Sequence, residues 1–130
     1  LDSGGKILYH AGAVFASNYL VTVLDASRKL LEKDGIPGSE SLGPALSLAQ
    51  GTLQNVERIG IPAALSGPVE RGDVGTLRKH WEEIRNRMPE LMVGYGELAL
   101  RTVDVALAKG SVSEKCADEV RNIFRPGGGE

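Results

Sequence analysis

The sequence has one cysteine and no excess of charge of either sign. Because Cys116 is the only cysteine in 130 residues, the chain cannot form an internal disulfide or a multi-cysteine metal site. Lysine and arginine number 15, aspartate and glutamate number 17, and the formal net charge is −2. That balance gives no surplus of positive charge to neutralise phosphates. We therefore expect a protein of a reducing compartment, the cytoplasm by default, that does not bind nucleic acid.

Several familiar patterns are also missing. No stretch alternates apolar and polar residues in the way of a half-buried strand. Neither G-x-G-x-x-G after a strand nor G-x-x-x-x-G-K-[ST] occurs, so the chain lacks both common phosphate-binding loops. No His, Cys or carboxylate cluster has the spacing of metal ligands. The sequence therefore predicts an all-α protein without a metal.

The length and composition fit one domain. Hydrophobic residues make up 42% of the chain and charged residues 25%, which is ordinary for a soluble globular protein of this size. We expect a single helical domain over residues 1–130, with about five helices packed around one long central helix. The opening LDSGGK has no initiator methionine and no signal-peptide pattern, so we also expect a piece of a longer protein.

The central helix is predicted over Lys6–Lys33. At about 100° per residue, a set of its polar residues falls within roughly a third of the circumference. The other sides are largely apolar, so protein should surround the helix on most sides. We call these polar residues the seam: His10, Ser17, Asn18, Asp25 and Arg28.

Two other interpretations of this helix are open. Ile7–Leu24 has no formally charged residue, a length close to that of a membrane span. However, His10 and Asn18 inside it are costly in hydrocarbon, so a membrane is not the expected partner. The seam can also be structural, since a helical His beside a Ser is more often a satisfied core group than a catalyst.

Four more helices are predicted. Pro44 begins one that ends at Gly60, and Asp73 is the expected N-cap of another over Val74–Arg87. After Pro89, a helix runs to Lys109, with Gly110 closing it. The last helix is expected to follow a capping box at Ser111 and Glu114 and to stop at Pro126.

The buried faces of these helices follow from apolar spacing. The predicted stripes are Leu46, Ala49, Leu53 and Val56; Leu77, Trp81, Ile84 and Met88; Leu91, Tyr95, Leu98, Thr102 and Val105; and Cys116, Val120, Ile123 and Phe124.

Ile61–Asp73 is the least regular stretch. Two prolines and two glycines in it prevent a continuous helix. Leu65 and Val69 are apolar and should fix the loop to the body of the protein, which would hold Arg71 in a defined position. We therefore expect a shaped loop, although a plain solvent-exposed connector is the alternative.

Two stretches together carry a family resemblance. Tyr9–Asn18, YHAGAVFASN, and Ala64–Asp73, ALSGPVERGD, resemble the helical C-terminal domain of Rossmann-like oxidoreductases catalogued as domain of unknown function 2520. Leu53, Asn55 and Gly60 also match that pattern. Where the family more often has Thr, this sequence has Ser66, which keeps the hydroxyl.

The resemblance implies a fold and a set of partners. It implies a helical domain like the C-terminal domain of 6-phosphogluconate dehydrogenase, related in architecture to those of ketopantoate reductase and pyrroline-5-carboxylate reductase. An N-terminal Rossmann domain of the same parent chain, absent here, would bind NAD or NADP. The helical domain would close over a small-molecule substrate and often mediate dimerisation, so a homodimer is expected. This domain alone should bind no cofactor and have no activity.

The resemblance and the chemistry of the side chains suggest roles for the site residues. His10 is the best proton donor or acceptor, because its ordinary pKa lies near neutrality. Asn18 would act beside it, and Ser17 would orient the polar atoms of the substrate. Ser66, Gly67, Pro68 and Arg71 would form the opposite wall, with Arg71 suited to a carboxylate or phosphate. The alternative is a non-catalytic dimerisation or scaffold module, in which the seam is a polar network that fixes helix register.

Overall fold

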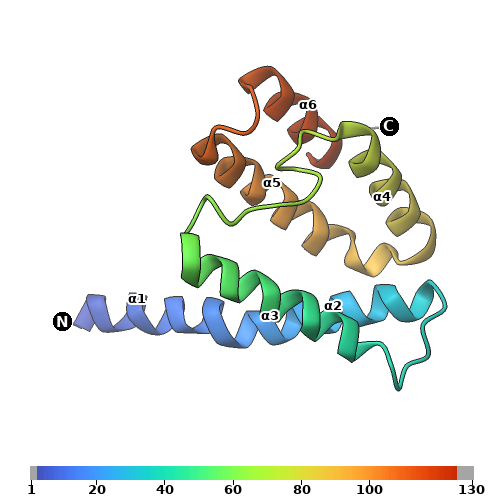
Figure 1. Cartoon of the computed structure of the whole chain (residues 1–130), viewed down its shortest axis with the longest axis horizontal. Coiled ribbons are helices and arrows are strands. Elements are labelled where there is room, and N and C mark those ends of the chain that lie inside the picture. Colours follow the sequence, from blue (N-terminus) through green and yellow to red (C-terminus); the bar gives the residue numbers. More distant parts are fainter. Residues whose placement is uncertain (1–2, 126–130) are drawn as a thin grey trace. The chain divides into compact units, whose positions relative to one another are not determined.

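The structure is a computed structural model that describes residues 3–125 (Figure 1). No strand occurs within that range, so the all-α prediction is confirmed. The helical elements are α1 (Ser3–Ala13), a π-helical turn (Val14–Asn18), α2 (Tyr19–Lys33), α3 (Leu42–Ile59), α4 (Val74–Arg87), a 3₁₀ turn (Pro89–Leu91), α5 (Met92–Lys109) and α6 (Glu114–Phe124). The predicted stop at Pro126 lies outside the described residues.

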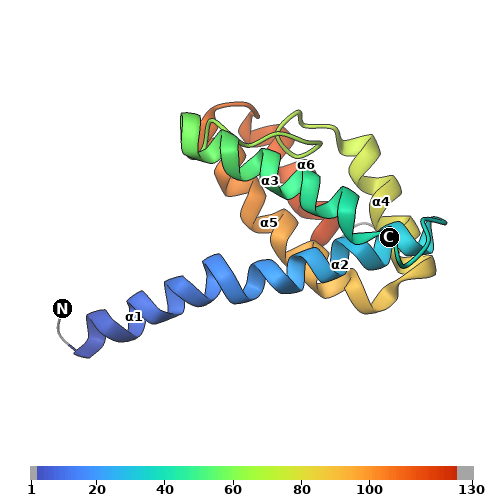
Figure 2. The same ribbon diagram turned by 60° about the horizontal axis from the view of Figure 1, so that its bottom comes forward.

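The chain divides into two compact units, residues 1–50 and 51–130, and α3 runs across the division. The first unit contains α1 and α2, which continue through the π-helical turn as one rod (Figure 2). The second contains α4, α5 and α6, packed against one another. Counting the rod once, residues 3–125 contain the five helices that the sequence predicts.

Most helix ends lie where glycine and aspartate predict them. Gly35, Gly60 and Gly110 follow α2, α3 and α5 with φ values of 107°, 76° and 79°, which a residue without a Cβ adopts at little cost. Asp73 caps α4, accepting hydrogen bonds from Thr76 N at 3.1 Å and Thr76 Oγ1 at 2.7 Å. α3 begins at Leu42, slightly before Pro44.

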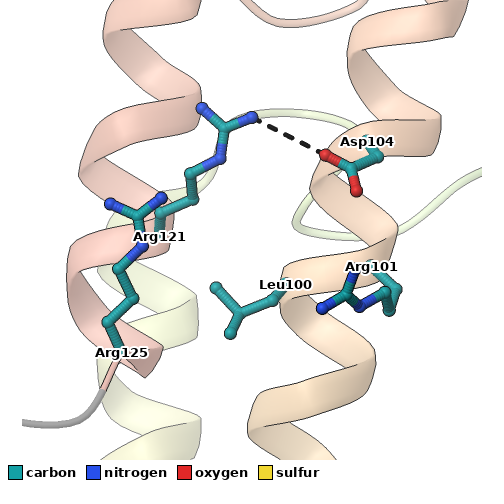
Figure 3. Close-up of a pocket in the computed structure, with 5 residues that line it drawn as sticks. All are labelled: Leu100, Arg101, Asp104, Arg121 and Arg125. Atoms are coloured by element: carbon teal, nitrogen blue, oxygen red, sulfur yellow. Dashed lines mark ion pairs between the residues drawn. The ribbon is translucent and has the colours of Figure 1, made fainter.

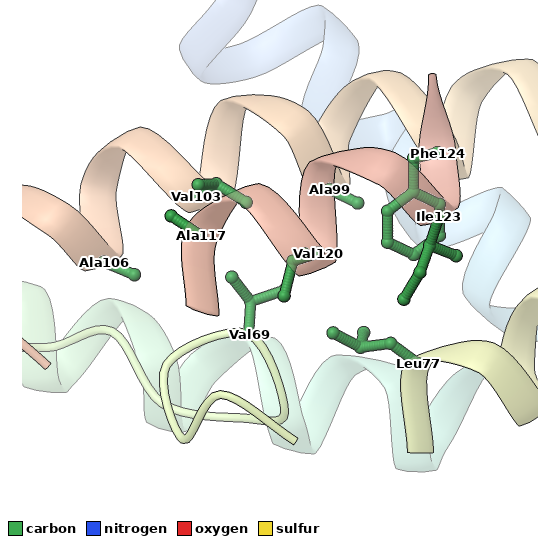
Figure 4. Packing of buried hydrophobic residues seen from close by; sticks show 9 residues of the cluster. All are labelled: Val69, Leu77, Ala99, Val103, Ala106, Ala117, Val120, Ile123 and Phe124. Atoms are coloured by element: carbon green, nitrogen blue, oxygen red, sulfur yellow. The ribbon is translucent and has the colours of Figure 1, made fainter. Parts of the chain in front are cut away.

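The core of the second unit lies between α4, α5 and α6 (Figure 4). Small side chains line the contact between α5 and α6, which allows the two backbones to approach closely. Val69 reaches the same core from the loop before α4, so the core also holds that loop. The buried cluster consists of Val69, Leu77, Ala99, Val103, Ala106, Ala117, Val120, Ile123 and Phe124.

The predicted buried stripe of α5 is wrong in part, although its Tyr95 packs against the core. Leu98 is 53% exposed, and the buried positions are Gly96, Ala99, Val103 and Ala106. A Cβ added at Gly96 would lie 3.0 Å from Trp81 Cη2, so only small residues fit on this side. The prediction failed because it placed the largest apolar side chains inside, whereas the close packing of this helix requires the smallest.

Two further predictions need correction. The N-cap of α6 is Ser113, whose hydroxyl accepts from Cys116 N at 3.1 Å, and not Ser111. Ser111 instead directs its own hydroxyl to Ala106 O at 3.5 Å, at the end of α5. In the α3 stripe, Leu53 is 54% exposed, and the buried residue of this helix is Ala45.

The rod does not have the enclosed position that its sequence predicts. None of its most apolar 18-residue stretch is buried. Large apolar side chains are exposed to solvent along the first two thirds of its length. A wide apolar face predicts burial, but it does not tell whether the same chain or another molecule covers that face. The exposed apolar residues of the rod are Ile7, Leu8, Tyr9, Phe15, Tyr19, Val21 and Val23, each at least 45% exposed.

Two glycines of α5 give a matched test of the packing. Gly96→Leu should lower the free energy of unfolding by about 1–3 kcal/mol, since the added side chain meets Trp81 in an already filled space. Gly94→Leu should raise it by about 0.5–1 kcal/mol, because nothing lies within 4 Å of the added Cβ and leucine favours a helix. Urea denaturation measures both, and equal effects would contradict the packing.

Candidate functional site

A π-helical turn interrupts the rod at Val14–Asn18. Tyr19 N donates to Val14 O, an i→i+5 bond in place of the usual i→i+4. Such a turn holds one extra residue, so α2 is rotated by about 100° from the phase that a continuous α-helix would give. Ser17 and Asn18 lie within this turn, and both are exposed. His10 is exposed on α1.

The second half of the predicted seam is an ion-pair network. Arg28 Nη2 lies 2.7 Å from Asp25 Oδ1, and Lys29 Nζ lies 2.9 Å from Asp25 Oδ2. The hydrogen bond from Lys29, with that from Arg28, lowers the pKa of Asp25 despite partial desolvation. Because Asp25 and Arg28 are paired within α2, they have a structural role there.

The network continues into the connection between α2 and α3. Arg28 Nη1 donates to Glu32 Oε1 at 3.1 Å, and the hydroxyl of Ser41 lies 2.8 Å from the same oxygen. Ser41 is completely buried, so its hydroxyl needs such an acceptor. The seam therefore divides into a structural half on α2 and a solvent-facing half formed by His10, Ser17 and Asn18.

The second predicted segment is a tightly folded loop before α4. Arg71 N donates to Gly67 O at 3.1 Å, and Asp73 N donates to Pro68 O at 2.8 Å. Gly67 has φ 95°, which disfavours any residue with a Cβ. Gly67 and Pro68 are half-buried, whereas Ser66 and Arg71 are exposed. The loop thus presents a hydroxyl and a guanidinium on a hydrogen-bonded backbone.

Contacts from α5 and α6 hold this loop in place. Lys109 Nζ donates to Leu65 O at 2.8 Å and lies 2.9 Å from Glu70 Oε1. At the far end, a Cβ added at Gly72 would come within 2.7 Å of Cys116 Sγ, so the loop backbone lies directly on α6. No local sequence pattern predicts the contact between Lys109 and Glu70, because the two residues lie far apart in the chain.

A second polar region lies between α5 and α6 (Figure 3). Three arginines and Asp104 line a shallow hollow over Leu100. Arg121 Nη1 lies 3.0 Å from Asp118 Oδ1, and this hydrogen bond raises the pKa of Arg121. Asp104 and Glu114 also approach Arg121, each at 3.7 Å. Its charge is therefore balanced by carboxylates of its own unit. The lining residues are Leu100, Arg101, Asp104, Arg121 and Arg125.

The described residues bear on metal binding and on membrane insertion. Within 3–125, no group of three or more His, Cys, Asp and Glu side chains is arranged to hold a metal ion. One helical stretch, residues 4–33, is long and apolar enough to cross a membrane by length and composition, with a mean hydropathy of 1.4 in its most apolar window. That stretch is the rod. It also carries Ser17, Asn18 and the Asp25–Arg28 ion pair, which suit a water-facing or protein-facing helix better.

Comparison with protein families identifies the class to which the chain belongs. Residues 1–102 match the family model described as "Domain of unknown function (DUF2520)". The match includes both segments discussed above, so the chain is a member of this family. No curated protein and no solved structure matches the chain.

The N-cap of α4 gives a test by pH. Hydrogen bonds from Thr76 lower the pKa of Asp73, so the stabilisation by its carboxylate is full above the pKa of an unfolded aspartate, about 3.9. It is lost as the pH falls through the lower folded-state pKa. The melting temperature of the chain should therefore exceed that of Asp73→Asn at neutral pH, and the difference should shrink in acid. A difference independent of pH would contradict the assignment.

Proposed function

We propose that this chain is the substrate-binding and dimerisation domain of an NAD(P)-dependent oxidoreductase. A Rossmann domain of the same parent protein would hold the NAD or NADP, and this domain would supply the groups that bind the substrate and exchange a proton with it. Two sets of residues would do so: His10, Ser17 and Asn18 on the rod, which are exposed, and Ser66, Gly67, Pro68 and Arg71 on the loop, of which Ser66 and Arg71 are exposed.

The π-helical turn is the observation that carries this proposal. Such turns are rare and are found frequently at functional sites, because they disturb the regular ladder of backbone hydrogen bonds. Here the turn coincides with Ser17 and Asn18, which the family resemblance had already marked. Their exposure leaves the hydroxyl and amide available to a ligand.

The proposed roles follow from the chemistry of each group. Hydride transfer to a carbonyl or imine carbon leaves negative charge on oxygen or nitrogen, and a proton must be supplied there. His10 would supply it, with Asn18 placing the reacting atom. Arg71 would bind a substrate carboxylate through its planar guanidinium, and Ser66 would add a hydrogen bond. The dinucleotide would supply the hydride when bound.

The exposed apolar surface of the rod supports dimerisation. Phe15 and Tyr19 pack edge to face, with ring centroids 5.2 Å apart, and are 73% and 52% exposed. Exposed aromatic side chains among apolar neighbours are characteristic of the centres of protein interfaces. A second copy of the chain is the partner we propose for this surface, in agreement with the expected homodimer.

One observation favours the scaffold alternative. Asp25, Arg28, Lys29 and Glu32 form a network that fixes the conformation of α2, which is the role a register-setting seam would have. It accounts for the second half of the seam only. His10, Ser17 and Asn18 take no part in that network, so the proposed function rests on them.

The catalytic assignment is tested in the complete protein with its dinucleotide-binding domain. NADPH oxidation would be followed with a panel of 2-oxo acids and cyclic imines, the reducible groups that suit a proton donor and an arginine. For a substrate so found, His10→Ala should lower kcat by about a hundredfold or more, the usual contribution of general acid catalysis. The melting temperature should change little, because His10 is exposed.

Lys6→Ala is a suitable control, since Lys6 is also an exposed polar residue of α1. It should keep nearly full activity. If His10→Ala retains full turnover with an unchanged fold, His10 has no catalytic role. If no member of the panel is reduced while NADPH binds, the proposed substrate class is wrong.

Dimerisation is tested by charge substitution on the rod. Phe15→Asp should convert the dimer to a monomer in sedimentation equilibrium, because a carboxylate in an apolar interface loses its hydration without gaining a partner. Val93→Asp is the matched control, since Val93 is 80% exposed on α5 in the other unit. It should leave the dimer intact. A monomeric unmodified chain, or a dimeric Phe15→Asp variant, would contradict the proposal.

A further inference from the structure

We infer that Lys109 is a positioning residue, which holds the turn Ser66-Gly67-Pro68 in the conformation that the substrate meets. It lies beyond the residues that the family model matches, and its side chain reaches back from the last turn of α5 to the loop. That this turn meets a substrate rests on the proposed function. The anchoring of the turn does not.

The ammonium group of Lys109 bonds to both sides of the turn. Before Ser66, it donates to Leu65 O at 2.8 Å, and after Pro68 it pairs with Glu70 Oε1 at 2.9 Å. The ammonium group of Lys109 therefore bridges the two ends of the stretch 65–70. Both side chains of the ion pair are largely shielded from water, with exposed fractions of 27% for Lys109 and 22% for Glu70. Shielding of this kind makes an ion pair stronger than one on an open surface.

Lys109 adds a polar attachment where the apolar packing of the loop is weakest. Val69, 8% exposed, is inserted in the core, and Gly72 lies against Cys116. Both hold the end of the loop that leads into α4. At the other end, Leu65 packs against the core but is only half-buried, and Lys109 bonds to its carbonyl oxygen. Without Lys109, this end would be held by the packing of Leu65 and by backbone hydrogen bonds within the loop alone.

The exposure pattern agrees with a positioning role. Ser66 and Arg71 are exposed, while Leu65 and Glu70, which bond to Lys109, are half-buried. The ammonium group of Lys109 is already bonded to Glu70 Oε1 and Leu65 O, so it is not available to contact a ligand. It therefore acts through the turn, in the way that second-layer contacts hold a binding residue in its productive geometry.

Amide hydrogen exchange of the complete protein tests the anchoring directly. Lys109→Met keeps the length of the side chain and removes its charge. The amides of Arg71 and Asp73, which are bonded within the loop, should exchange about tenfold faster or more. Amides inside α6, such as that of Ala117, should keep their rates. Unchanged rates at Arg71 and Asp73, or an equal increase in α6, would overturn the inference.

Matched variants separate charge from bulk. Lys109→Arg can still bond to Glu70 and should restore slow exchange. Glu70→Gln removes one partner and leaves Leu65 O, so it should give an intermediate rate. Lys115→Met removes an exposed lysine of α6 and should change nothing in the loop. Fast exchange in Lys109→Arg, or an equal effect from Lys115→Met, would contradict a specific anchor.

A kinetic measurement with the substrate found in the NADPH assay tests the consequence for function. Lys109→Met should raise KM severalfold with a smaller change in kcat, and Lys109→Arg should recover most of the loss. If exchange responds but neither Lys109→Met nor Ser66→Ala alters turnover, the anchor stands and the proposed function fails. If Ser66→Ala impairs turnover while Lys109→Met alters neither exchange nor KM, the anchor fails alone.

Discussion

The close contact between α5 and α6 is the constraint on which the second unit depends. Ala99, Val103 and Ala106 face Ala117 and Val120 across this contact, and larger side chains would force the helices apart. Val69 from the loop and Leu77 from α4 pack on the surface so formed. The loop that carries Ser66 and Arg71 is therefore positioned by the core, to which Lys109 adds a polar attachment.

A different constraint governs the rod. Its apolar side chains are exposed along α1 and the π-helical turn, and water is an unfavourable surrounding for a surface of this kind. His10, Ser17 and Asn18 interrupt that surface with groups that can bind a polar ligand. An interface with protein that leaves room for a polar ligand would satisfy both properties, and the dimer that we propose would supply one.

The sequence predicted helix boundaries well and buried faces less well. Gly35, Gly60 and Gly110 end helices because of backbone conformation, which is a local property that a sequence displays. The buried face of α5 is instead set by Trp81 on another helix, which leaves room only for Gly96. For the same reason, the bond from Lys109 to Glu70 has no signature in the sequence. The π-helical turn has no signature in the sequence either. The seam was predicted with a constant 100° per residue along the whole rod, and the turn breaks that period between α1 and α2.

The central claim is that the polar groups of the rod, His10 and Asn18, act on the substrate of the proposed oxidoreductase. A crystal structure of the complete protein with NADPH bound tests it most directly. We expect both residues to lie at the substrate side of the nicotinamide ring. If His10 and Asn18 face away from the nicotinamide, the claim is wrong.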